Sequence, residues 1–181
     1  MRKIVLFFIV ALCVFVARAQ ESVKLDLVEV VPVEGVSADD LYNRAEMWIS
    51  QAFKNPDRVV KYKNKESHQL ILNPETPFRY SKLSGSEGVK GPIAYTIKIN
   101  TREGRYRLEI TDCYHKAAIY GFGLLTTDSV LLEPKHKGIT LKWQQNVWTE
   151  LLATMRKEMA IISASLKAAM VIPDSSQSED W

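Results

Sequence analysis

The sequence predicts an α+β domain of two layers, an antiparallel sheet with two helices on one face, in the order β-α-β-β-β-β-α. Three features support this fold class. Residues 92–115 contain two runs of alternating apolar and polar residues joined by a Gly-containing turn, the pattern of a β-hairpin. Residues 37–54 and 141–170 each carry one apolar stripe at helical spacing. Because both stripes need an apolar surface, we expect both helices to pack on the apolar side of the hairpin.

The hairpin is expected to have one apolar and one polar face. A register that pairs Ile99 with Tyr106 places apolar or aromatic side chains along one entire face. The opposite face is polar and should meet water. The candidate binding residues are polar side chains of that second face: Thr96, Lys98, Arg105, Arg107 and Glu109.

The first 19 residues have the form of a secretory signal peptide. A basic start precedes an apolar run over residues 4–16, and residues 17–19 fit the A-x-A cleavage pattern. The run is too short to span a membrane comfortably, so we expect cleavage before Gln20 and a periplasmic or secreted protein without a membrane span. Acylation of Cys13 is the competing interpretation. We do not favour a lipoprotein, because Cys13 lies inside the apolar run and follows Leu12.

Cleavage would change the charge balance of the chain. The signal peptide holds three of the 24 basic residues and none of the 21 acidic ones, so the mature chain would carry no net charge. A neutral chain argues against binding to nucleic acid or to acidic membranes as a bulk property. Of the two cysteines only Cys113 would remain. That excludes an intrachain disulfide and leaves stability to packing.

The mature chain, expected to form one domain over residues 20–172, begins with a strand and a helix. Residues 24–33 are rich in Val and Leu and end near a proline, which favours a first strand. Ser37 is a good N-cap and Asp40 stands at the position of a capping-box acid, so we expect a helix to start there. The helix should end at Asn55-Pro56.

The middle of the chain should add a second hairpin. Residues 58–63 and 68–73 are short segments with Val, Tyr, Leu and Ile, separated by a polar turn. Residues 74–91 are rich in Pro and Gly and are interpreted as a loop, in which residues 78–80 pair briefly with a sheet edge.

The last third of the chain combines an irregular connection with a long helix. Residues 116–138 mix glycines with apolar pairs, which argues against disorder and favours an ordered connection. Residues 141–170 contain no Pro or Gly. Trp48 and Trp148 fall on the two apolar stripes and are interpreted as core residues rather than as the lining of a ligand pocket. Residues 173–181 are expected to form a loose tail.

Three segments together resemble a family of exported proteins from Gram-negative bacteria. Behind the signal peptide they are the helix DLYNRAEMWISQAF, the hairpin YTIKINTREGRYRLEITDCYH and the end of the last helix, SASLKAAM. The family is a domain of unknown function with a TATA-box-binding-protein-like (TBP-like) fold. The resemblance implies a curved sheet with both helices behind it. It implies no activity, because none is established for the family, and fold analogy alone does not carry the DNA binding of other TBP-like proteins.

Cys113 and His115 are the most reactive pair of side chains in the sequence. Residues two apart on a strand share a face, so this pair suggests a thiol-dependent enzyme as the alternative function. Strict alternation places both on the polar face and turns Asp112 inward. We therefore favour a bulge or a strand end at Asp112, and a bulge would bury Cys113 as an ordinary core thiol.

The remaining patterns predict neither a cofactor nor a metal site. His68, His115 and His136 follow no known ligand spacing. The lysines at 61, 63 and 65 are interpreted as the solvated face of an edge strand. The sequence thus predicts a non-enzymatic binding or protein-interaction module of the cell envelope, with an unidentified protein or small-molecule partner. Nucleic-acid binding by fold analogy ranks last.

Overall fold

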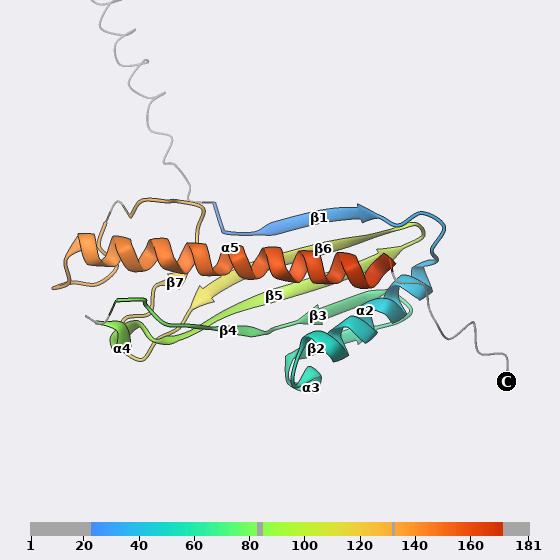
Figure 1. Ribbon diagram of the computed structural model, residues 1–181, viewed down its shortest axis with the longest axis horizontal. Coiled ribbons are helices and arrows are strands. Elements are labelled where there is room, and N and C mark those ends of the chain that lie inside the picture. The colour runs from blue at the N-terminus through green and yellow to red at the C-terminus, as the bar shows by residue number, and fades with distance from the viewer. Residues whose placement is uncertain (1–22, 83–84, 132, 172–181) are drawn as a thin grey trace, which may run out of the picture.

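The computed structural model describes residues 23–82, 85–131 and 133–171, which form one antiparallel sheet and two long helices (Figure 1). Helices α2 and α5 both lie on the same side of the sheet, as predicted. The predicted signal peptide and C-terminal tail lie outside the described residues. The elements in chain order are β1 (Leu27–Pro32), α2 (Ala38–Ala52), α3 (Pro56–Val59), β2 (Val60–Asn64), β3 (Gln69–Leu72), β4 (Glu75–Phe78), α4 (Ser86–Val89), β5 (Gly91–Arg102), β6 (Arg105–His115), β7 (Gly123–Leu124) and α5 (Leu141–Val171).

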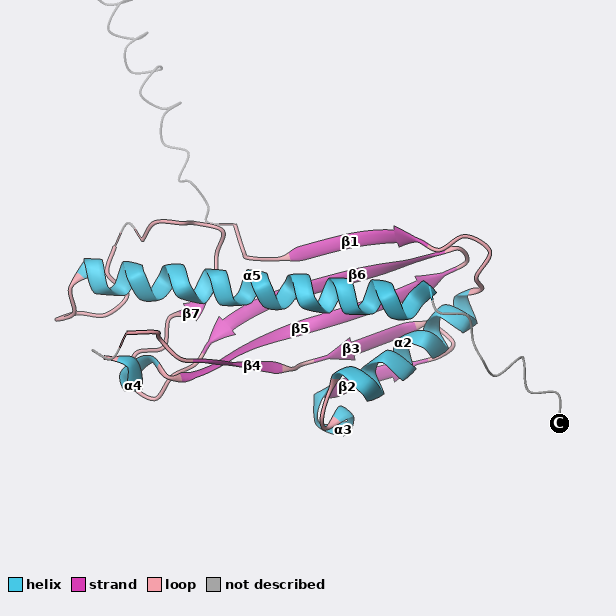
Figure 2. Ribbon diagram, viewed as in Figure 1, coloured by secondary structure: helices cyan, strands magenta, loops and turns pink. Residues whose placement is uncertain are grey.

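The hairpin of β5 and β6 is the centre of the sheet. The strand order is β1-β6-β5-β3-β2, with β4 also pairing with β5 and β7 with β6 (Figure 2). Every pairing is antiparallel. β3 and β4 pair one after the other with the same edge of β5. The break between them therefore lies opposite the middle of β5.

The predicted register of the hairpin is wrong by two residues. Ile99 pairs with Leu108, and Tyr106 pairs with Thr101. The reason is a turn of only two residues, in which Gly104 has a φ of 67°. The turn is held by the segment before α2: the N–H of Val33 donates to the Gly104 carbonyl at 2.8 Å, and the Gly104 N–H donates to the carbonyl of Val36 at 3.0 Å. A shift of two by itself moves no side chain to the other face of the sheet.

The start of α2 follows its predicted cap. The Ser37 hydroxyl oxygen accepts from the Asp40 N–H at 3.0 Å, while the same hydroxyl donates to the Asp40 carboxylate at 2.7 Å. The cap satisfies an N–H that the first turn leaves without a helical partner. Residues Leu41, Ala45 and Trp48 then lie buried on one side of the helix.

The core lies between the sheet and the two long helices. Ile97, Ile99 and Ile110 are fully buried under them, and Trp48 and Trp148 are core residues, as predicted. The two helices also contact each other, since the Trp48 Nε1–H donates to Ser165 Oγ at 2.7 Å. From β1, the inward-pointing Glu29 carboxylate binds α5, accepting from Ser163 Oγ at 2.6 Å.

Four short elements appear where the sequence predicted a strand start or irregular chain. Residues 56–59 form the one-turn helix α3 ahead of β2. The predicted loop 74–91 contains β4 and α4, and the connection after β6 contains β7. No helix within residues 23–82, 85–131 and 133–171 is both long and apolar enough to cross a membrane.

Candidate functional site

The face of the sheet turned away from α2 and α5, here called the open face, carries all five candidate binding residues. Arg105 and Arg107 are exposed on β6, and Thr96, Lys98 and Glu109 are partly exposed on β5 and β6. Their side chains alternate along each strand with buried ones. The predicted polar face is therefore present, and it is hollowed in two places.

The first depression lies at the turn end of the hairpin and is called the hairpin hollow. Its volume is about 520 Å³.

 Four of the five candidate binding residues line the hairpin hollow, and Thr96 does not. The lining residues are Val30, Ser67, Lys98, Asn100, Thr101, Arg102, Arg105, Tyr106, Arg107 and Glu109.

The hairpin hollow has an excess of positive charge. Arg107 Nε forms an ion pair with Glu109 Oε1 at 2.9 Å. Lys98, Arg102 and Arg105 have no ion pair within the described part of the chain. Three cations thus remain available beside one neutralised pair, an arrangement that attracts carboxylates.

The far end of the hairpin contains the bulge that the sequence favoured. The β5–β6 register shifts by one residue between Ala94 and Thr96, and Asp112 has a φ of 54°. An extra residue reverses the alternation of the strand beyond it. Cys113 and His115 are consequently buried, with exposed fractions of 1% and 0%. The placement on the polar face that strict alternation predicts for them is wrong.

His115 is held as a neutral side chain in the core. Its Nδ1 accepts from the Phe122 N–H at 3.2 Å, so Nε2 carries the proton and donates to the Val89 carbonyl at 3.0 Å. Burial lowers the pKa of His115 and raises the pKa of the Cys113 thiol to about 12. Because both ring nitrogens are occupied and the thiol is protonated at neutral pH, this pair is not arranged as a nucleophile and its base.

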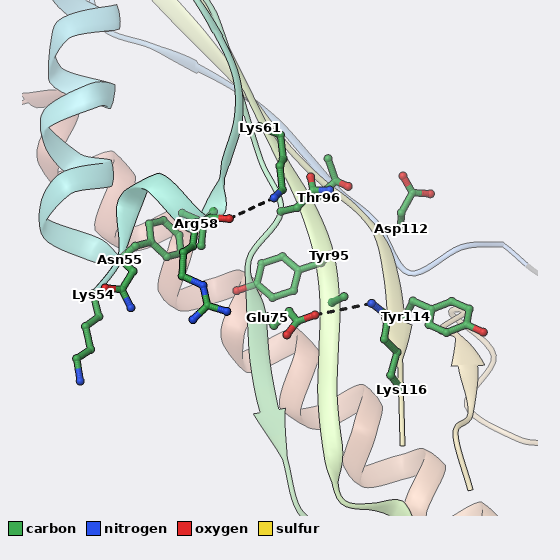
Figure 3. A pocket seen from close by; sticks show the side chains of 14 residues that line it. Lys54, Asn55, Arg58, Lys61, Glu75, Tyr95, Thr96, Asp112, Tyr114 and Lys116 are labelled. Carbon is green, nitrogen blue, oxygen red and sulfur yellow. Dashed lines mark hydrogen bonds and ion pairs between the residues drawn. The ribbon is translucent and has the colours of Figure 1, made fainter. Parts of the chain in front are cut away.

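The second depression lies beside the bulge and is called the bulge hollow (Figure 3). Its volume is about 710 Å³. Ala94 and Thr96 of β5 are among its lining residues. The others come from the segment 53–61, from the β3–β4 region and from the end of β6. The full lining is Phe53, Lys54, Asn55, Arg58, Val59, Lys61, Asn73, Glu75, Ala94, Tyr95, Thr96, Asp112, Tyr114 and Lys116.

Polar contacts in the bulge hollow involve both carboxylates of its lining. Lys116 Nζ lies 3.7 Å from Glu75 Oε1, and Lys24 Nζ lies 2.9 Å from Asp112 Oδ1. The hydrogen bond from Lys24 lowers the pKa of Asp112. Lys61 Nζ donates to the Arg58 carbonyl at 3.3 Å.

Sequence reasoning missed most of the bulge hollow. Arg58 was assigned to a strand, and Lys116 lay beyond the end of the hairpin. The one available signal was that strict alternation turns the charged Asp112 inward, which indicates a bulge. A bulge there turns Tyr114 toward the open face. No group of three or more His, Cys, Asp or Glu side chains that could hold a metal occurs in the described ranges.

Comparison with known proteins finds one matching family model. The profile described as a domain of unknown function (DUF4468) with TBP-like fold matches residues 28–116. The match confirms the predicted resemblance to that family. The DUF4468 match covers β1 to β6 and ends before β7 and α5. A search of curated protein sequences finds no match.

Solved structures extend the similarity beyond the DUF4468 profile. A DUF4468 family protein from Bacteroides ovatus matches with a TM-score of 0.58 and 12% identity, over 84% of this chain and 89% of that one. A TBP-like protein from Parabacteroides distasonis matches with a TM-score of 0.53 and 14% identity, over 80% and 93%. At these identities the similarity shows the fold alone.

Proposed function

We propose that this DUF4468 protein is an exported, non-enzymatic binding domain of the cell envelope, and that the hairpin end of its open face contacts an acidic surface of a partner protein. The observation that carries the proposal is the hairpin hollow, with Lys98, Arg102 and Arg105 free of ion pairs within the described residues. Arginine is enriched at protein interfaces and binds carboxylates through two parallel hydrogen bonds.

Two further points support this function. The first 19 residues have the pattern of a secretory signal, and their removal would leave a chain without net charge. A local cationic surface on a neutral protein favours one acidic partner over general attraction to polyanions such as nucleic acid. Val30 at the rim of the hollow is 60% exposed and supplies an apolar contact beside the charges.

Site-specific photo-crosslinking in the native cell envelope tests the proposal. A photoreactive residue at Lys98 should give a discrete cross-linked protein, whereas one at Lys157, exposed on α5, should not. The double variant Arg105→Glu, Arg107→Glu should abolish the product. The cross-linked chain should begin at Gln20. Equal products from both positions, or a product insensitive to the double variant, would contradict the proposed surface.

A further inference from the structure

The bulge hollow forms where both neighbours of β5 are irregular. On one side β3 ends at Leu72 and β4 begins at Glu75, and on the other side β6 is bulged at Asp112. Between these two irregularities the open face of β5 carries only small side chains, Ala94 and Thr96. Small side chains beneath two displaced strands leave room for a ligand.

The bulge hollow contains more cations than carboxylates. Four basic residues line it, and each of its two carboxylates already has a lysine partner. Arg58 and Lys54 have no ion pair within the described ranges. The basic residues are Lys54, Arg58, Lys61 and Lys116.

Three of these cations surround the same space. Figure 3 shows Arg58 and Lys116 reaching toward it from opposite sides, with Lys61 at its upper edge. Glu75 lies between them, in contact with Lys116. Lys54 points away from the space.

We propose that the bulge hollow binds a small ligand through a phosphate group, with Arg58, Lys61 and Lys116 as the donors. A phosphate monoester carries about two negative charges and three acceptor oxygens, which suits a guanidinium and two ammonium groups. The volume of about 710 Å³ admits a ligand of the size of a phosphorylated sugar. Glu75 competes with the phosphate for Lys116. This site does not depend on the partner surface at the hairpin hollow.

Calorimetric titration of the mature protein with glucose 6-phosphate tests the inference, with glucose and glucuronic acid as the neutral and carboxylate comparisons. We expect saturable binding of the phosphate ester alone. Arg58→Gln should weaken it about 10-fold, because a charged hydrogen bond is lost. Arg79→Gln is the matched control: Arg79 is exposed, pairs with Glu87 and lies outside the hollow, and its loss should leave the affinity unchanged.

Glu75→Gln gives a second, opposite readout. Removing the competing carboxylate should tighten binding about threefold, whereas a phosphate ester bound outside the bulge hollow would show no change. Absence of saturable binding, an unchanged affinity in Arg58→Gln, or glucuronic acid binding as tightly as the phosphate ester would overturn the inference. The variant Arg105→Glu, Arg107→Glu should leave the titration unchanged, so failure of the partner surface and failure of this site are separable.

Discussion

The two ends of the β5–β6 hairpin are built from the same alternation of side chains but differ by one residue of backbone. From Arg102 to Thr96, β5 pairs with β6 in an unbroken register. Beyond Thr96 the bulge at Asp112 adds a residue to β6. Side-chain direction has a period of two, so an even error in register leaves the faces intact and an odd insertion reverses them.

This difference separates two kinds of surface. At the turn end, Arg105 and Arg107 stay on the open face and line a cationic hollow. At the far end, Cys113 and His115 turn into the core while Tyr114 turns out. Cys113 and His115, the most reactive side chains of the hairpin, are therefore buried, and both hollows of the open face carry more basic than acidic side chains.

The largest effect on stability is expected from adding a side chain at Gly91, at the bulged end of the β5–β6 hairpin. Gly91→Ala would place a Cβ on the carbonyl oxygen of Lys116. Since backbone must move to make room, we expect a loss of roughly 3 kcal/mol in the free energy of unfolding. Denaturant titration measures it.

Gly104→Ala at the turn end is the control for that substitution. A Cβ there has no neighbour within 4 Å, so only the positive φ is penalised, by about 1 kcal/mol. Equal losses of unfolding free energy in the two variants would show that close packing at Gly91 does not make the bulged end of the hairpin more sensitive than the turn end.

A smaller effect is expected from His115. His115→Gln should cost about 2 kcal/mol, because the Phe122 N–H and the Val89 carbonyl lose well-placed partners. Burial lowers the pKa of His115 in the folded chain, so below pH 6.5 the unfolded chain binds a proton that the folded chain does not. The free energy of unfolding should then decrease as the pH is lowered below 6.5, by at most about 1.4 kcal/mol per pH unit.

The pH series needs its own comparison. His115→Gln should lose the part of the pH dependence that begins near 6.5. Glu29 also has a lowered pKa, through its hydrogen bond from Ser163, but its contribution is lost only as the pH falls below about 4.5. A wild-type slope near pH 6 that persists in His115→Gln would show that another group titrates there.

The smallest effect is expected at Asp112 itself. Asp112→Val places a β-branched residue at positive φ and should cost about 1 kcal/mol, whereas Asp112→Gly should change stability by less than about 0.5 kcal/mol. Thermal unfolding compares the two. If valine and glycine were equivalent, the left-handed backbone at this bulge would not limit the choice of residue.

Local patterns of the sequence determined the fold class and the faces of the elements. Alternation along 92–115 assigned the open face, and Ser37 with Asp40 marked the start of α2. Such features depend on residues close together in the chain. They therefore survive an incorrect register, provided that its error is even.

The tertiary structure decided the register and the far end of the hairpin. The turn closes at Gly104 because the backbone of Val33 and Val36 binds it. His115 turns inward, where Val89 and Phe122 occupy both ring nitrogens. Val33, Val36 and Val89 come from segments distant in the sequence, and Phe122 lies beyond the end of β6, so no periodicity within the hairpin could specify them. The bulge hollow follows from the same cause, because its cations converge only after β3, β4 and the bulged β6 have been placed against β5.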